Sequence, residues 1–204
     1  MNLNYRPWTS IYALLAISLT SACAIQPAQP SDQVDSNQHL SQLADLKQWQ
    51  ANGKASVTND QQSLTLTVEW QQQGDQLQVS MTGPLGQGNG QLSGSPGQYQ
   101  LLGPQGEFYA ANLNDFSWQL LGTDLPLDSL RWWLLGMPDP NLAYSISFND
   151  LGLAGEITQA GWQIHYPRYQ GQELPLPNRI DLKQLDSTST GNNRARIVIT
   201  QWQH

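Results

Sequence analysis

The chain is poor in cysteine and in positive charge, and each scarcity excludes a class of protein. Its 204 residues contain a single cysteine, so no disulfide can form within the chain. Nine Lys and Arg residues stand against 16 Asp and Glu residues, which gives a formal net charge of −7. Phosphate binding needs clustered Lys and Arg side chains, and the sequence has none. The composition therefore predicts no nucleic-acid partner.

Catalytic and metal-binding motifs are also missing. The three histidines, His39, His165 and His204, show neither metal-ligand spacing nor the HExxH pattern, and no GxSxG motif occurs. The run GQGNGQ at residues 86–91 superficially resembles a phosphate-binding loop, but neither a following helix nor a Lys-Ser/Thr pair completes it. The sequence therefore predicts a protein that is not an enzyme and that needs no cofactor and no metal.

The chain lacks an apolar run of the roughly 20 residues that a membrane-spanning helix needs. Residues 11–19 form a shorter apolar run followed by small residues, which is typical of a secretory signal peptide. The sequence LTSAC, ending at Cys23, resembles the bacterial lipobox, with Thr20 where the motif usually has Leu. The resemblance implies a signal peptide over residues 1–22, lipidation of Cys23 and, with Ala24 next, export to the outer membrane. The alternative is a plain signal peptide with Cys23 as a free thiol.

Two further segments follow. Residues 23–37 are rich in Gln, Pro, Ser and Asp, so we expect a lipidated N-terminus and a flexible tether. Residues 38–204 are expected to form one domain. Leucines at helical spacing predict a short helix over residues 38–48, capped by Ser36 or Asn37.

Beyond this helix, the hydrophobic period changes from helical to two. In QQSLTLTVEWQQQ, four apolar residues alternate with polar ones, and DQLQVSM, AYSISF, GWQIHY and ARIVITQW repeat the pattern. Turn signals such as Ser-Pro-Gly separate about eleven such segments. Closely spaced antiparallel strands with one apolar face predict a mainly β fold, an open or half-closed antiparallel β-barrel.

One block, from Asn112 to Gly136, interrupts the strands with two short apolar helices. Asn112 is the expected N-cap and Gly122 the expected end of the first, while the second begins near Leu127 or Asp128 and ends at Gly136. The open apolar face of the curved sheet is the most economical place for them, as a lid. Beneath it, apolar side chains either fill a core or line a hydrophobic cavity. The candidate lining residues, each equally compatible with a sealed core, are Trp70, Trp133, Trp162 and Ile164.

The turn SMTGPLGQGNG places an apolar residue, Leu85, where water usually meets polar side chains. The leucine either folds back onto the sheet or protrudes between Pro84 and Gly86, which would hold it rigidly. Fully burying a leucine yields roughly 1.5–3 kcal/mol. That energy is enough to orient the protein on an apolar surface but too little to anchor it alone.

Together these blocks resemble the LolB family of outer-membrane lipoprotein receptors. The matching segments follow the family's order and spacing through the whole domain: TGPLG (82–86), LPLDSLRWWLLGMP (125–138), GWQIHY (161–166), LPLP (174–177) and the terminal strand ending at Trp202. The resemblance implies that residues 38–204 form one lipoprotein-binding half-barrel domain, a half-closed antiparallel β-barrel with a helical lid over a hydrophobic cavity. It also implies a function, which is to accept acylated lipoproteins from the periplasmic carrier LolA and to insert them into the outer membrane.

The same resemblance implies the partners and the location. Leu85 is expected to engage outer-membrane phospholipid, and the protein, expected as a monomer, to be lipid-anchored in the inner, periplasmic leaflet. Its acidic balance suits a basic carrier surface. One alternative is a structural or assembly lipoprotein with a filled core and a protein-binding surface. Another is a lipid-handling esterase, which would need a nucleophile–base pair that the sequence does not show.

Overall fold

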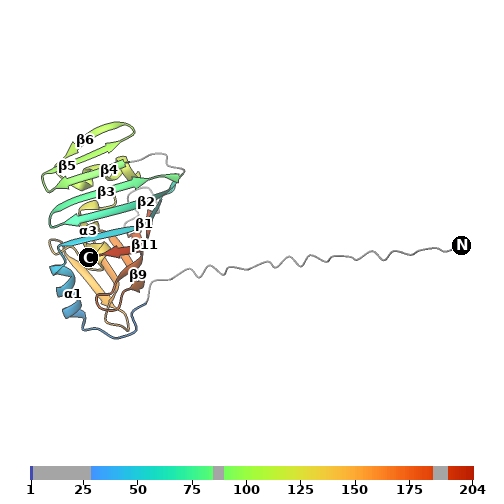
Figure 1. The fold of residues 1–204 in the computed structure, drawn as a ribbon. Helices are drawn as coiled ribbons and strands as arrows, with labels where there is room; N and C mark the ends of the chain where they lie inside the picture. The colour runs from blue at the N-terminus through green and yellow to red at the C-terminus, as the bar shows by residue number, and fades with distance from the viewer. Residues whose placement is uncertain (2–28, 85–89, 186–192) are drawn as a thin grey trace.

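The computed structural model describes residue 1 and residues 29–84, 90–185 and 193–204. Within them, eleven antiparallel strands form one sheet in the order β6-β5-β4-β3-β2-β1-β11-β10-β9-β8-β7 (Figure 1). The strands are β1 (Gln48–Thr58), β2 (Ser63–Gln73), β3 (Gln76–Thr82), β4 (Gly90–Ser95), β5 (Gln98–Gly103), β6 (Gly106–Ala110), β7 (Tyr144–Phe148), β8 (Ala154–Gln159), β9 (Trp162–Gln170), β10 (Leu176–Gln184) and β11 (Arg194–Gln203). Pairing of β1 with β11 joins two meanders at the centre of the sheet.

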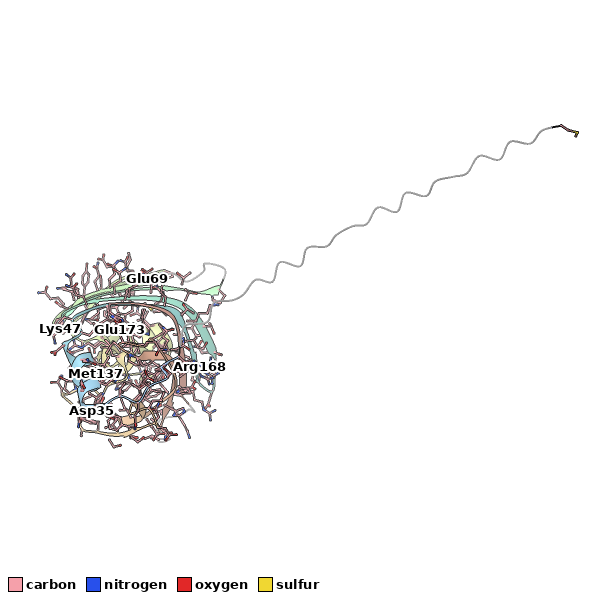
Figure 2. The ribbon with its side chains drawn as sticks, turned by 60° about the horizontal axis from the view of Figure 1, so that its bottom comes forward. Asp35, Lys47, Glu69, Met137, Arg168 and Glu173 are labelled. Atoms are coloured by element: carbon pink, nitrogen blue, oxygen red, sulfur yellow. The ribbon has the colours of Figure 1, made fainter. Side chains whose placement is uncertain are left out.

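One face of this sheet is apolar, as the alternating pattern predicts. In β3, Leu77, Val79 and Met81 are buried. Figure 2 shows the sheet curving around the interior, with the exposed Glu69 on its outer side. Strands β6 and β7 stand at the two ends of the order, so the barrel is not closed. The prediction of a mainly β, half-closed antiparallel barrel of about eleven strands is confirmed.

The end strand β7 follows the alternating pattern without burying its side chains. Tyr144 and Phe148 are 53% and 42% exposed. Among the described residues, β7 has a neighbouring strand on one side only, where it pairs with β8. The alternation of apolar and polar residues therefore predicted this strand correctly. Its side chains are exposed because the strand lies at the end of the sheet.

Helix α1 (Ser36–Asp45) begins slightly before its predicted start at Gln38. Its N-cap is Asp35, and not Ser36 or Asn37 as predicted, because the Asp35 carboxylate accepts a hydrogen bond from the Gln38 N–H at 2.8 Å. A carboxylate at this position also interacts favourably with the positive end of the helix dipole.

The described part of the predicted tether lies against the body of the protein. The Val34 N–H donates to the Leu151 carbonyl oxygen at 2.9 Å, and the Gln172 side chain donates to the Gln29 carbonyl oxygen at 2.6 Å. Gly152 has φ +78°, and a Cβ there would lie 2.2 Å from the Val34 carbonyl oxygen. Only glycine permits this approach, so the loop that carries it receives the chain just before α1.

The predicted helical block forms a lid across the apolar face of the sheet. Its elements are the 3-10 helix η2 (Leu113–Phe116) and the α-helices α2 (Ser117–Leu121) and α3 (Leu127–Leu135). Gly122 and Gly136 adopt the left-handed conformation and end α2 and α3, as predicted. Asn112 precedes η2, but its side chain makes no capping hydrogen bond. In the described ranges, no helix has both the length and the apolarity that a membrane crossing requires.

Candidate functional site

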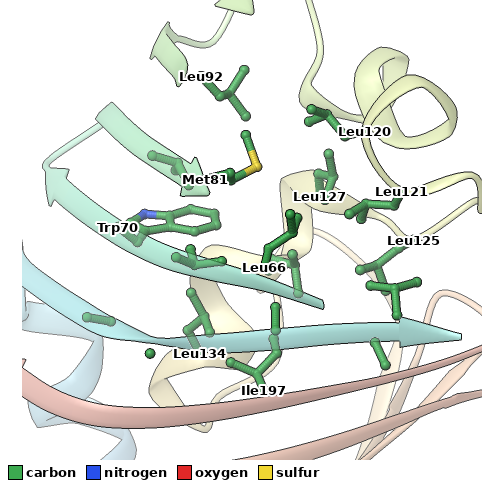
Figure 3. Close-up of a pocket in the computed structure, with 18 of the residues that line it drawn as sticks. Leu66, Trp70, Met81, Leu92, Leu120, Leu121, Leu125, Leu127, Leu134 and Ile197 are labelled. Atoms are coloured by element: carbon green, nitrogen blue, oxygen red, sulfur yellow. The ribbon is translucent and has the colours of Figure 1, made fainter. Parts of the chain in front are cut away.

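An apolar cavity of about 90 Å³ lies between the lid and the centre of the sheet (Figure 3). Strands β1 to β4 and β11 form its floor, and the lid forms its roof. Apart from Lys54, which is exposed, the lining residues are apolar. The large side chains of the floor are Val57, Leu66, Val68, Trp70, Val79, Met81, Leu92, Ile197 and Ile199, and those of the roof are Leu113, Leu120, Leu121, Leu125, Leu127, Leu130 and Leu134.

Several small residues on the inner face of the sheet centre, among larger ones such as Ile197, leave room for the cavity. Ala51, Gly53 and Ala55 of β1 line it, and Ala195 of β11 lies among the same lining residues. A Cβ at Gly53 would lie 2.2 Å from the Val198 carbonyl oxygen, so this position admits only glycine. Bulky leucines above such small residues leave unfilled space. These residues were not predicted from the sequence, although the run ANGKAS shows small residues at alternate positions.

Trp70, one of the four predicted lining residues, lines this cavity. Its indole N–H donates to the Gln72 side-chain oxygen at 2.9 Å. Its ring stacks on Trp49 with 6.0 Å between ring centroids, and Trp202 meets Trp49 edge-on at 5.5 Å. Because the hydrogen bond and the stacking fix the indole ring, Trp70 forms a rigid wall of the cavity.

The other predicted lining residues, Trp133, Trp162 and Ile164, lie outside this cavity, in a second part of the core. All three are almost completely buried. In α3, the helical repeat turns Leu134 toward the cavity and Trp133 toward β8, where its indole N–H donates to the Gln159 side-chain oxygen at 2.8 Å. Here the alternative of a sealed core describes the packing.

Buried polar groups fasten α3 to β8 and β9. The Gln159 side chain accepts from the Asp139 N–H at 2.8 Å and donates to the Asp139 carbonyl oxygen at 2.9 Å. The Tyr166 hydroxyl donates to the Trp133 carbonyl oxygen at 3.0 Å, and the Tyr169 hydroxyl donates to a carbonyl oxygen of β8 at 2.8 Å. Burial raises the pKa of Tyr166 and Tyr169 above the usual range, so both remain neutral donors. This network makes α3 the fixed part of the lid.

The η2–α2 segment is held by hydrogen bonds near its two ends. The Asn59 side-chain amide in the β1–β2 turn donates to the Gly122 carbonyl oxygen at 3.0 Å. At the other end, the Leu113 N–H donates to an Asp128 carboxylate oxygen at 3.1 Å. Both bonds are only partly buried, and between them Leu120 lines the cavity. The Ser117 hydroxyl of α2 also donates to the Leu125 carbonyl oxygen at 2.7 Å, in a buried bond between two residues of the lid. We therefore expect the segment to be easier to displace from the sheet than α3, because its buried bond stays within the lid while those of α3 reach β8 and β9.

Of the predicted membrane-insertion turn, the structure describes Pro84, which is exposed. Leu85 and Gly86 lie outside the described residues. Where β4 begins, Gly90 pairs with Met81, which lines the cavity. The turn therefore leaves and rejoins the sheet beside Met81, one of the residues that line the cavity.

The described part of the chain contains no group of His, Cys, Asp and Glu side chains suited to a metal ion. His165 is exposed on its strand, as expected. His39 is buried in α1, its Nε2 lies 2.9 Å from the Pro175 carbonyl oxygen, and burial lowers the pKa of its imidazole. Cys23 lies outside the described residues, so its lipidation stays a prediction.

Comparison with known proteins gives consistent matches. The family model described as outer membrane lipoprotein LolB matches residues 47–202. The outer-membrane lipoprotein LolB of Pseudomonas fluorescens is 33% identical over 193 residues, which cover 91% of each chain. That of Chromohalobacter salexigens is 30% identical over 194 residues, which cover 93% of this chain and 88% of the relative.

Two solved structures resemble the fold. A putative outer membrane lipoprotein-sorting protein domain from Vibrio parahaemolyticus aligns with a TM-score of 0.51 at 8% identity, over 83% of this chain and 93% of that chain. A DUF1329 family protein from Desulfovibrio piger aligns with a TM-score of 0.53 at 8% identity, over 84% of this chain and 94% of that chain. At this level of identity, the likeness concerns the fold alone.

Proposed function

The chain belongs to the LolB family of outer-membrane lipoproteins, and from this premise we propose that it is the receptor that accepts lipoproteins from the periplasmic carrier LolA. The acyl chains of the cargo bind in the apolar cavity beneath the lid, and the receptor then inserts them into the outer membrane. The cavity is the observation that carries this proposal. Binding and release of lipid require no catalytic residue and no cofactor.

Sequestration follows from the cost of exposing acyl chains to water. Each CH₂ group of an acyl chain gains about 0.8 kcal/mol when it is buried, so a multiply acylated protein does not cross an aqueous space bare. Transfer without nucleotide hydrolysis must run downhill, from carrier to receptor to bilayer. The receptor's cavity should therefore bind acyl chains more tightly than the carrier does and less tightly than the membrane.

The size of the cavity implies that the lid moves when cargo enters. Its 90 Å³ is below the roughly 300 Å³ at which small-molecule sites begin. Since buried hydrogen bonds hold α3, we expect the η2–α2 segment to move away from the floor and enlarge the space. The closed cavity would then be the unloaded state.

The anchor and the insertion turn complete the proposal. Cleavage after residue 22 and acylation of Cys23 would fix the protein to the periplasmic leaflet of the outer membrane, with residues 23–37 as the lipidated tether. Leu85 would protrude into the lipid beside Pro84, whose exposure fits this role. The acidic charge of the chain would assist docking of a basic carrier surface.

Filling the cavity tests the proposal directly. The form to use begins at Ala24 and is mixed with the carrier–lipoprotein complex. In Ala55→Leu, a larger apolar side chain occupies the floor, so we expect cargo uptake to fall by about tenfold or more while thermal stability is retained. Ser56→Leu, at the neighbouring outward position, is the matched control and should take up cargo normally. If wild-type protein leaves the cargo on the carrier, the assembly-lipoprotein alternative replaces the receptor.

Replacing the insertion leucine separates uptake from delivery. Leu85→Glu should accept cargo from the carrier at the wild-type rate, because the cavity is unchanged. Its delivery into outer-membrane vesicles should fail, because a carboxylate does not enter the apolar layer. Normal delivery by this variant would show that Leu85 folds back onto the sheet.

A further inference from the structure

The outer face of α2 carries a large apolar side chain. Trp118 is 64% exposed, whereas its neighbours Ser117 and Leu121 are buried and Leu120 lines the cavity. The exposed residue beside it is Gln119, which is polar, as an outward helix position normally is. An indole in such a place leaves a large apolar area in water, and such exposure commonly marks an interaction site.

Helix α2, which carries Trp118, covers the cavity that Met81 lines beside the start of the insertion turn. Two residues after Trp118, on the other side of α2, Leu120 lines the cavity together with Met81 and Leu92 (Figure 3). Met81 pairs with Gly90, at which β4 leaves the turn. Lipid that leaves the cavity beside this turn therefore passes the helix that carries Trp118.

Charge does not explain the exposure of this residue. Within η2 and α2 the charged residue is Asp115, and Asp124 follows shortly afterwards, so this part of the lid is acidic. An acidic surface has no electrostatic attraction to phosphates. Tryptophan nevertheless favours the boundary between water and lipid, where its ring is apolar and its N–H remains hydrated.

We propose that Trp118 is a second membrane-contact residue, which lays the outer face of α2 on the bilayer surface while the inner face covers the cavity. This inference rests on the proposed receptor function and extends it to the lid. Contact with lipid stabilises α2 in a displaced position, so the cavity opens where the chains can enter the membrane. The bilayer itself thereby becomes the signal for release.

The test uses the full-length, lipidated protein in phosphatidylcholine vesicles, with carrier–lipoprotein complex as the donor. Trp118→Gln should take up cargo normally but release it into the bilayer about tenfold more slowly, a difference of about 1.4 kcal/mol. Trp118→Phe, which remains aromatic and apolar, should retain most of the release rate. Tyr109→Gln is the matched control, because Tyr109 is 72% exposed on β6, outside the lid. Added salt should not change the effect, since no ion pair is involved.

A direct contact measurement accompanies the transfer assay. Brominated acyl chains should quench more fluorescence in the wild type than in Trp118→Phe, and Tyr109→Gln should match the wild type. Equal quenching in wild type and Trp118→Phe, with unchanged release in Trp118→Gln, overturns the proposal. Slower uptake from the carrier with normal release would mean that Trp118 docks the carrier, and this also overturns it. If wild-type protein takes up no cargo, the receptor function fails, and the quenching result alone decides whether Trp118 contacts lipid.

Discussion

The single residue Gln159 shows how this protein accommodates a buried polar side chain. Its side chain is 2% exposed, and its amide bonds the Trp133 indole, the Asp139 N–H and carbonyl groups of Asp139 and Leu142. Every polar atom of the amide therefore has a partner. Burying an amide that has all its hydrogen-bond partners lowers the free energy of unfolding little. Leaving those partners unpaired lowers it strongly.

Removal of this amide should destabilise the fold strongly. Gln159→Leu leaves several buried donors and acceptors unsatisfied, so the free energy of unfolding should fall by about 3 kcal/mol or more. Urea denaturation measures it. Gln78→Leu, at an exposed position of β3, should change stability by no more than about 0.5 kcal/mol. Similar losses for the two variants would mean that the network does not hold α3.

His39 predicts a dependence of stability on pH. Burial lowers the pKa of its imidazole below the ordinary value of 6.5, so the folded state holds it neutral. Below 6.5 the unfolded chain binds the proton more readily than the folded one. Its contribution to stability is therefore complete above that pH and is lost as the pH falls toward the lower folded pKa. The difference in unfolding free energy between wild type and His39→Gln should shrink from about pH 7.5 to about pH 5.5. A constant difference would contradict this.

At the scale of elements, the two helical parts of the lid are attached in different ways. Helix α3 is held to β8 and β9 through Trp133 and Tyr166 by buried hydrogen bonds. The buried bond of α2, from Ser117 to Leu125, stays within the lid, and the bond from Asn59 to Gly122 is only partly buried. The short length of α2 adds to this, since five residues form few internal hydrogen bonds of their own. We therefore expect η2–α2 to move when the lid opens and α3 to stay in place.

Asn59→Asp tests whether η2–α2 is the movable part of the lid, because Asn59 bonds Gly122 at the end of α2. The Asn59 side-chain oxygen accepts from the N–H groups of Gln61 and Gln62, and aspartate preserves both bonds. The donor to the Gly122 carbonyl is lost, however, and a carboxylate faces that oxygen instead. Amide hydrogen exchange in α2 should accelerate, and acyl uptake should become faster, while the β1–β2 turn keeps its protection. Unchanged exchange in α2 would show that this bond does not hold the lid.

At the scale of the whole molecule, one sheet supports two different interiors. Over β8, β9 and β10 the core is filled by large side chains, including Trp162 and Ile164. Over β1 and β11 the inner face carries alanines and a glycine among larger residues such as Ile197 and Ile199, and the lid spans a cavity. The pairing of β1 with β11 joins the two parts and gives both a common rigid frame.

This division predicts a gradient of local stability. Native-state hydrogen exchange should be slowest in β8, β9 and α3 and fastest in η2 and α2, because local opening is easiest where few polar contacts are buried. Cargo or a bound fatty acid should change exchange in the lid much more than in β9. Uniform protection across lid and sheet would contradict a movable lid.

The fold could be predicted from the sequence because its strands and helix ends are marked by local residue patterns. Alternating apolar residues define strands, and glycines such as Gly122 and Gly136 end helices wherever they occur. The N-cap was predicted wrongly, because Asp35, Ser36 and Asn37 are all capping residues. Only the backbone path before α1 decides which of them meets the Gln38 N–H.

What the sequence determined by itself was the class of fold, the lid and, through its matching motifs, the family. The site was decided by tertiary structure. Trp70 and Trp133 both stand on apolar faces, and no local pattern separates them, because each meets residues remote in the sequence. Trp70 faces the alanines and glycine of the sheet centre, while Trp133 meets Gln159 and fills a sealed core. A cavity is unfilled space between distant elements, so its position follows only from how those elements pack.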